Sequence, residues 1–198
     1  MATENVTTDW IMTASGRPFW PLEPRLQDVA IEDIAHHLSN LCRFTGAVRL
    51  FYSVAQHSVE VSRAMAPHMF TGRHRSAALY GLLHDASEAY LMDIPRPLKH
   101  DAQFSAYRAA EARLQRVIYA AFDLDPDDEP AELKLVDRRM LRTEQRDLMP
   151  PPALAERRDD VEPFAFHLTE PWSPARSRWK FMERFHEIAS ASLEGQLS

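Results

Sequence analysis

The chain has 198 residues, of which 45% are hydrophobic and 26% charged, and its formal net charge is −6. This length favours one domain, and the negative charge argues against extensive binding to a nucleic-acid polymer. The sequence contains no apolar run near the roughly 18 residues of a membrane span and no N-terminal secretory pattern. Since Cys42 is the single cysteine, an intramolecular disulfide is excluded, and we expect a cytoplasmic protein with no membrane association.

The N-terminal region is expected to be irregular, because three prolines interrupt residues 1–27 and proline breaks helices. A first helix is predicted from Ile31, and Asp28 could cap its start. Apolar residues recur at helical spacing as far as Cys42, which we expect to be buried on this helix.

Helical periodicity dominates the rest of the chain, which predicts an all-α fold. Ser53 could cap the second helix, and prolines exclude a helix interior between Asp93 and Leu98. In the last helix, Trp179, Phe181 and Phe185 are expected to pack into the core. The helices are predicted over residues 53–65, 75–90, 104–122, 131–148 and 174–190, with an acidic turn over 123–130.

Four potential metal ligands lie on three predicted helices. His57 is early in the second helix, His84 and Asp85 lie in the middle of the third, and Asp137 lies in the fifth. This mixture of imidazole and carboxylate suits Zn, Mn, Co, Ni or Fe. Asp85 has apolar neighbours, so its charge needs a partner. A metal is one such partner and a buried arginine is another.

Several sequence segments resemble those of the HD-domain phosphohydrolases, whose signature is the order H…HD…D. The similarity covers roughly residues 30–150 and, more loosely, the last helix. Within that superfamily it is closest to the small bacterial 5′-deoxynucleotidases and the phage-type dATP triphosphohydrolases. The segments are Asp33–Gly46, Ser53–Ser58, Leu82–Tyr90, Asp93–Lys99, Asp137 and Glu144–Met149.

The resemblance implies a single HD-domain helical bundle over residues 1–198. It also implies that His57, His84, Asp85 and Asp137 bind a divalent ion, with Mg added to the candidate metals. Glu88 corresponds to a catalytic glutamate. Its position one turn after His84 puts both on one helix face, where Glu88 could activate the attacking water or protonate the leaving oxygen. Otherwise Glu88 is an ordinary exposed carboxylate.

Four further residues match substrate contacts of the family. Arg43 corresponds to a phosphate-binding arginine, although a surface or ion-paired arginine is the alternative. It is followed by Phe44, where the monophosphatase branch has tryptophan. Asp93 corresponds to a ligand of the sugar 3′-hydroxyl, or else is a turn residue. Lys99 corresponds to a phosphate-side lysine, or else is solvated. Other candidates for substrate contact are His36, His37, Asn40, Arg96 and His100.

The expected activity is cleavage between the α-phosphorus and the 5′-oxygen of a 5′-deoxynucleotide. A dNTP such as dATP is slightly favoured over a dNMP. A phosphodiesterase, a catalytically silent nucleotide sensor and a purely structural helical module are the alternatives. The resemblance also implies a homo-oligomer.

Overall fold

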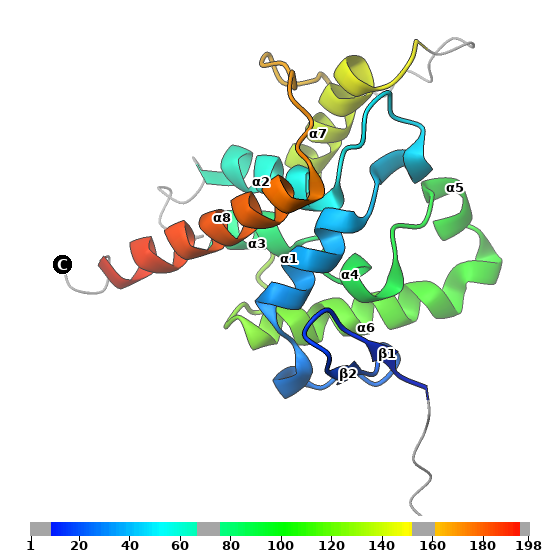
Figure 1. Cartoon of the computed structure of the whole chain (residues 1–198), viewed down its shortest axis with the longest axis vertical. Helices are drawn as coiled ribbons and strands as arrows, with labels where there is room; N and C mark the ends of the chain where they lie inside the picture. The colour runs from blue at the N-terminus through cyan, green and yellow to red at the C-terminus, as the bar shows by residue number, and fades with distance from the viewer. Residues whose placement is uncertain (1–8, 67–75, 152–160, 195–198) are drawn as a thin grey trace, which may run out of the picture.

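The computed structural model describes residues 9–66, 76–151 and 161–194, and α-helices dominate it (Figure 1). The all-α prediction is therefore confirmed. Besides short 3-10 turns at residues 26–28, 43–46 and 102–104, the helices are α1 (Ile31–Asn40), α2 (Val54–Met65), α3 (Ala77–Leu83), α4 (Glu88–Leu91), α5 (Arg96–Lys99), α6 (Ser105–Ala121), α7 (Leu133–Leu148) and α8 (Pro174–Glu194).

The core lies around α2, which packs against α3, α7 and α8, while α1 packs against α4 and α8 (Figure 1). The close approach of α2 and α3 depends on Gly81, because a Cβ there would lie 3.0 Å from the Ser62 Cα and 3.0 Å from the Met65 Cγ. Apolar side chains from all these helices form one buried cluster, which includes Ile34, Leu38, Val59, Leu82, Leu114, Ile118, Met140 and Phe181.

A small hairpin precedes the helices. Its strands β1 (Ile11–Met12) and β2 (Pro18–Phe19) are antiparallel, with Met12 opposite Pro18. The prediction of irregular structure is wrong here, because proline is compatible with an edge strand and Phe19 is fully buried, stacked on Tyr90. Residues 1–8 lie outside the described part of the chain.

The boundaries of α1 differ from the prediction. Ala30 is the N-cap residue and no side chain caps the helix, whereas Asp28 belongs to the preceding 3-10 turn. The helix ends before Cys42, which is half-buried and forms an isolated bridge with Ser53. The predicted cap of α2 is confirmed, since the Ser53 Oγ accepts a hydrogen bond from the Gln56 N–H at 3.1 Å.

The continuous helix predicted over residues 75–90 is wrong, because α3 ends at Leu83 and α4 begins at Glu88. Between them the backbone bonds are of the tighter i→i−3 kind, such as the one that the Glu88 N–H donates to the Asp85 carbonyl at 3.0 Å. His84 and Asp85 therefore lie in a turn at the end of a helix.

Gln115 of α6 explains this break. Its Oε1 accepts a hydrogen bond from the Ser87 N–H at 3.0 Å, and its Nε2 donates to the Leu83 carbonyl at 2.7 Å. In a continuous helix the Ser87 N–H would donate to that same carbonyl. The Gln115 amide is thus inserted into the helical hydrogen-bond ladder, a recognised cause of kinks.

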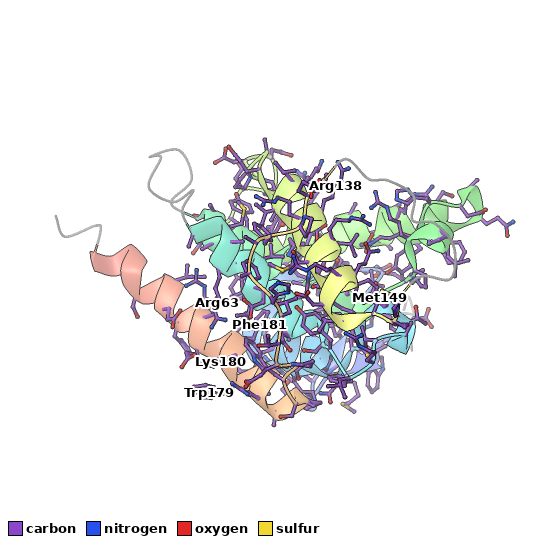
Figure 2. The ribbon with its side chains drawn as sticks, turned by 90° about the horizontal axis from the view of Figure 1, so that it is seen from above. Arg63, Arg138, Met149, Trp179, Lys180 and Phe181 are labelled. Atoms are coloured by element: carbon purple, nitrogen blue, oxygen red, sulfur yellow. The ribbon has the colours of Figure 1, made fainter. Side chains whose placement is uncertain are left out.

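Later elements follow the prediction more closely. The loop predicted between Asp93 and Leu98 is partly wrong, since Arg96–Lys99 forms one helical turn with proline in its first turn, where proline is tolerated. Phe181 is fully buried and Phe185 packs against the core, but Trp179 is 57% exposed. Figure 2 shows Trp179 at the edge of the molecule and Phe181 nearer its centre.

Among the described residues, no helix combines the length and apolarity needed to cross a membrane.

Candidate metal centre and adjoining basic cavity

The four predicted metal ligands come together from three places in the fold. His57 is fully buried on α2, His84 and Asp85 occupy the turn after α3, and Asp137 lies on α7. The His57 Nε2 is 3.2 Å from the His84 Nε2 and 3.6 Å from the Asp85 Oδ2. The Asp137 Oδ1 is 3.2 Å from the His57 Nε2 and 3.8 Å from the His84 Nε2.

These separations are those of atoms that share an ion. Ligand atoms about 2.0–2.2 Å from a tetrahedral metal lie roughly 3.3–3.6 Å from one another. His57, His84 and Asp85 each offer one ligand atom, all within 4.8 Å of one another. Both the donor set and its spacing fit a divalent metal.

Hydrogen bonding turns both imidazoles toward the same point. The His57 Nδ1 lies 2.6 Å from the Glu144 Oε1, and the His84 Nδ1 lies 2.9 Å from the Gly81 carbonyl. Both partners are acceptors, so each Nδ1 carries the proton and each Nε2 of a neutral ring presents a lone pair. Two lone pairs 3.2 Å apart beside two carboxylates repel one another unless a proton or a metal cation lies between them.

The electrostatics of the centre agree with this geometry. Burial lowers the pKa of His84, but the carboxylates of Asp85 and Asp137 outweigh it, and the net pKa is raised well above the usual value. The pKa of His57 is raised as well, since Glu144 and Asp137 outweigh burial and the nearby Arg43. The cluster therefore favours positive charge at its centre.

Glu88, the predicted catalytic residue, is buried beside this centre. Its side chain is 6% exposed and the Oε1 lies 4.0 Å from the Lys99 Nζ. The Oε2 is buried without a hydrogen-bond partner among the described residues. Burial, followed by the negative charges of Asp85 and Asp93, raises the pKa of Glu88 well above its usual value. The interpretation of Glu88 as an ordinary exposed carboxylate is therefore wrong.

Lys99 lies at the end of α5 and is held between two carboxylates. Its Nζ forms an ion pair with Glu111 of α6 and also approaches Glu88. The Arg108 guanidinium donates to the carbonyl oxygens of Lys99 and Asp101 and so fastens the end of α5 to α6. Lys99 is thus half-buried and paired, and the interpretation as a solvated lysine is wrong.

Arg43 is buried and ion-paired. Its Nε and Nη2 donate to the Glu144 Oε2 at 3.1 and 2.9 Å, and its Nη1 lies 3.6 Å from the Asp85 Oδ2. Glu144 is fully buried on α7 and was not among the site residues expected from the sequence. Its spacing of seven residues from Asp137 was a usable signal, because residues seven apart lie on the same helix face.

Phe44 and Asp93 line the same cavity as Arg43. Phe44 and Thr45 have φ of 55° and 53° and Gly46 has φ of 81°, so the segment after Arg43 is a short left-handed turn, which non-glycine residues rarely adopt. The Phe44 ring centroid lies 5.5 Å from the Arg43 guanidinium carbon. Burial raises the pKa of Asp93.

The cavity has a volume of about 690 Å³ and reaches Asp85 and Asp137. Its walls come from α5, α7, the left-handed turn and the Asp93 loop. Arg138 of α7 and Met149, which directly follows that helix (Figure 2), both line it. Although the chain has a net charge of −6, the basic side chains lining this cavity are Arg43, Arg96, Lys99, Arg108, Lys134 and Arg138, with His100.

The three polar residues of α1 suggested by the sequence lie elsewhere. His36 and Asn40 line a separate hollow beside Trp179. The His37 Nδ1 donates to the Ala89 carbonyl at 2.8 Å, and its Nε2 accepts from the Ala14 N–H at 3.1 Å. His37 therefore links the hairpin to the helix that carries Glu88, outside the cavity lining.

Comparison with known proteins gives one full-length relative. The chain is 35% identical to the uncharacterized protein YfdR of Escherichia coli over 181 residues, which is 91% of this chain and 96% of YfdR. The chain belongs to the YfdR family. Because so few residues lie outside this match, the similarity to YfdR spans the whole site from Arg43 to Glu144.

A second relative of this YfdR-family chain is an uncharacterized protein of Rhodobacter capsulatus. It is 36% identical over 127 residues, or 63% of each chain. No family model matches the chain.

Proposed function

We propose that this YfdR-family protein is a metal-dependent phosphohydrolase of the HD-domain kind that acts on 5′-deoxynucleotides. The observation that carries the proposal is the convergence of His57, His84, Asp85 and Asp137 on one point at the wall of a basic cavity. A divalent ion held by these side chains would supply Lewis acidity toward a phosphate oxygen and lower the pKa of water.

The cavity residues fit a phosphate ester. The Arg43 guanidinium lies beside Asp85 and is held there by Glu144. Because its side chain is already fixed before a substrate binds, it can offset phosphate charge without a further cost in ordering. Lys99, which lines the same cavity, adds a second positive charge. Phe44 offers an aromatic wall for the base or sugar, and Asp93 offers a carboxylate for the sugar 3′-hydroxyl.

Glu88 is assigned the role of general acid in this proposal. The leaving 5′-oxygen of a nucleoside is a poor leaving group unless it is protonated. Burial and the neighbouring charges of Asp85 and Asp93 keep the proton on Glu88 by raising its pKa. Its neutral carboxyl can therefore donate to the 5′-oxygen as the bond to the α-phosphorus breaks.

A nucleotide fits the size and charge of the cavity. Its volume of about 690 Å³ falls in the range of small-molecule sites. Mono- and triphosphate substrates break at the same bond, and they differ in the space and positive charge required beyond the α-phosphate. The six lysine and arginine side chains of the lining support the triphosphate, which remains slightly favoured.

The test is a product analysis. Purified protein is incubated with dNTPs, dNMPs and ribonucleotides in the presence of Zn, Co, Mn, Ni, Fe or Mg, and separately with chelator. We expect metal-dependent release of deoxynucleoside together with triphosphate or phosphate. The His84→Ala and Asp85→Ala variants should be inactive but folded. Failure of the metal-loaded protein to hydrolyse any of these nucleotides would overturn the proposal, and nucleotide binding without turnover would indicate a sensor.

A further inference from the structure

Glu144 is the buried group that connects the two halves of the site. It lies on α7, two turns after Asp137, and its side chain is 0% exposed. One oxygen contacts His57 and the other contacts Arg43. A carboxylate without access to water is costly to bury unless it is fully paired, and these two partners use both of its oxygens.

The contact with His57 determines which ring nitrogen faces the metal centre. An ionised carboxylate can only accept, so the 2.6 Å contact with the Glu144 Oε1 requires a proton on the His57 Nδ1. The Nε2 lone pair then points toward His84, Asp85 and Asp137. Such partners of a ligating histidine orient the ring and raise its basicity.

The contact with Arg43 gives this buried cation a closer partner than the ligand carboxylate of Asp85. The Arg43 Nη1 is 3.6 Å from the Asp85 Oδ2, whereas the Nε and Nη2 both bond the Glu144 Oε2. Without the second carboxylate, Asp85 would be the nearest anion to the guanidinium. Arg43 would then compete with a metal for the same oxygen.

We propose that Glu144 is a positioning residue that couples the metal centre to the anion site. It holds His57 in the tautomer that binds metal and holds Arg43 where a phosphate can reach it. This inference rests on the proposed function, because it assumes that the cluster binds metal and the cavity binds phosphate. It predicts that a single isosteric change at Glu144 weakens both zinc binding and phosphate binding.

The main test is Glu144→Gln. Its amide has one accepting oxygen, so the nitrogen must face either the Arg43 donors or the His57 Nδ1. If the amide nitrogen faces Arg43, two donors meet and Arg43 is displaced. If it faces the His57 Nδ1, that nitrogen must accept, and the ring proton moves to Nε2. We expect zinc affinity, measured by competition with a chromophoric chelator, to fall by about 10–100-fold. A loss of less than tenfold in the folded variant would overturn the inference.

Glu60→Gln is the matched control. Glu60 is a largely buried carboxylate on α2, three residues after His57, and pairs with Arg63. The change therefore removes the same charge near His57 without breaking a described hydrogen bond to a ligand. Zinc affinity of this control should stay within about threefold of the wild type. A loss equal to that of Glu144→Gln would mean that charge alone is responsible, and would also overturn the inference.

The affinity of the anion site is measured by calorimetric titration of zinc-loaded protein with inorganic phosphate. We expect weaker phosphate binding in Glu144→Gln than in Glu60→Gln, and equal binding in the two variants would overturn the coupling. Circular dichroism verifies that each variant is folded.

The tautomer is also read directly in the zinc-loaded wild type, by long-range ¹H–¹⁵N spectra of the imidazole rings. A proton on the His57 Nδ1 is expected, and zinc bound through Nδ1 would overturn the inference without any variant. Zinc binding by the wild type with no hydrolysis of any nucleotide would instead contradict the proposed function and leave the role of Glu144 standing.

Discussion

At the residue scale, Glu88 shows how burial prepares a side chain for chemistry. Its Oε1 lies 4.0 Å from the Lys99 Nζ, and its Oε2 is buried without a hydrogen-bond partner among the described residues. Desolvation disfavours the ionised form, and the charges of Asp85 and Asp93 add to the effect. The raised pKa lets a glutamate hold its proton where an exposed glutamate would have lost it.

Glu88→Gln should lower kcat by about 10²–10⁴-fold, because the variant has no proton to donate. In the wild type a general acid works below its pKa, so kcat/KM should fall as the pH rises through the raised pKa of Glu88. The remaining activity of the variant should lack that alkaline decline. Rate measurements across pH check this, and an unchanged profile in Glu88→Gln would assign the decline to another group. Zinc affinity should stay within about threefold, because among the described residues the Glu88 carboxyl pairs with Lys99 and not with a ligand side chain.

Arg43 shows the limit of residue-level prediction. From the sequence, phosphate binding and ion pairing were alternative interpretations of Arg43. In the structure Arg43 is ion-paired and also lines the cavity. The spacing from Arg43 to Glu144 is 101 residues, so no local pattern could predict their contact.

At the element scale, the break between α3 and α4 decides where His84, Asp85 and Glu88 point. Periodicity predicted one helix here because the segment has helical spacing on both sides of the break. The break comes from Gln115, a residue 28 positions after Ser87 in sequence, whose amide replaces a backbone hydrogen bond. A long-range side-chain contact thus overrides local propensity.

Gln115→Leu should therefore lower both the thermal stability and kcat. It leaves the Leu83 carbonyl and the Ser87 N–H without their partner, and loss of buried hydrogen bonds costs roughly 1–3 kcal/mol each. If these two groups pair with each other instead, α3 continues into α4 and the position of Glu88 relative to His84 and Asp85 changes. Thermal unfolding and kcat measure the two effects.

Arg116→Leu is the control for that experiment. It changes the adjacent position of α6, where an exposed arginine pairs with Asp127, and exposed pairs contribute little. The control should keep wild-type activity. Retention of both stability and kcat by Gln115→Leu would show that the break does not depend on the inserted amide.

At the scale of the whole molecule, the candidate metal centre joins parts of the chain that are far apart in sequence. Its side chains come from α2, the turn after α3, and α7, while Arg43 and Glu144 connect α7 to the segment before α2. An ion bound to the folded state alone stabilises the whole assembly by mass action.

Addition of zinc to chelator-treated protein should raise the Tm. At a free zinc concentration about 100 times the Kd, the gain is about 2.7 kcal/mol, which corresponds to roughly 5–10 °C for a chain of this size. Differential scanning calorimetry measures the shift. His84→Ala removes one ligand and should lose most of it, and an equal shift in that variant would place the stabilising ion elsewhere.

The sequence by itself determined the all-α class, the approximate extent of most helices, and the four candidate metal ligands that meet in the site. Periodicity and side-chain chemistry are local properties, and His57, His84, Asp85 and Asp137 carry theirs wherever the chain places them. Only the tertiary structure decided that Glu144 connects His57 to Arg43, that Gln115 opens the helix beside His84, and that Glu88 is buried. Each of these depends on contacts between residues far apart in sequence, and such contacts leave no local periodicity from which they could be predicted.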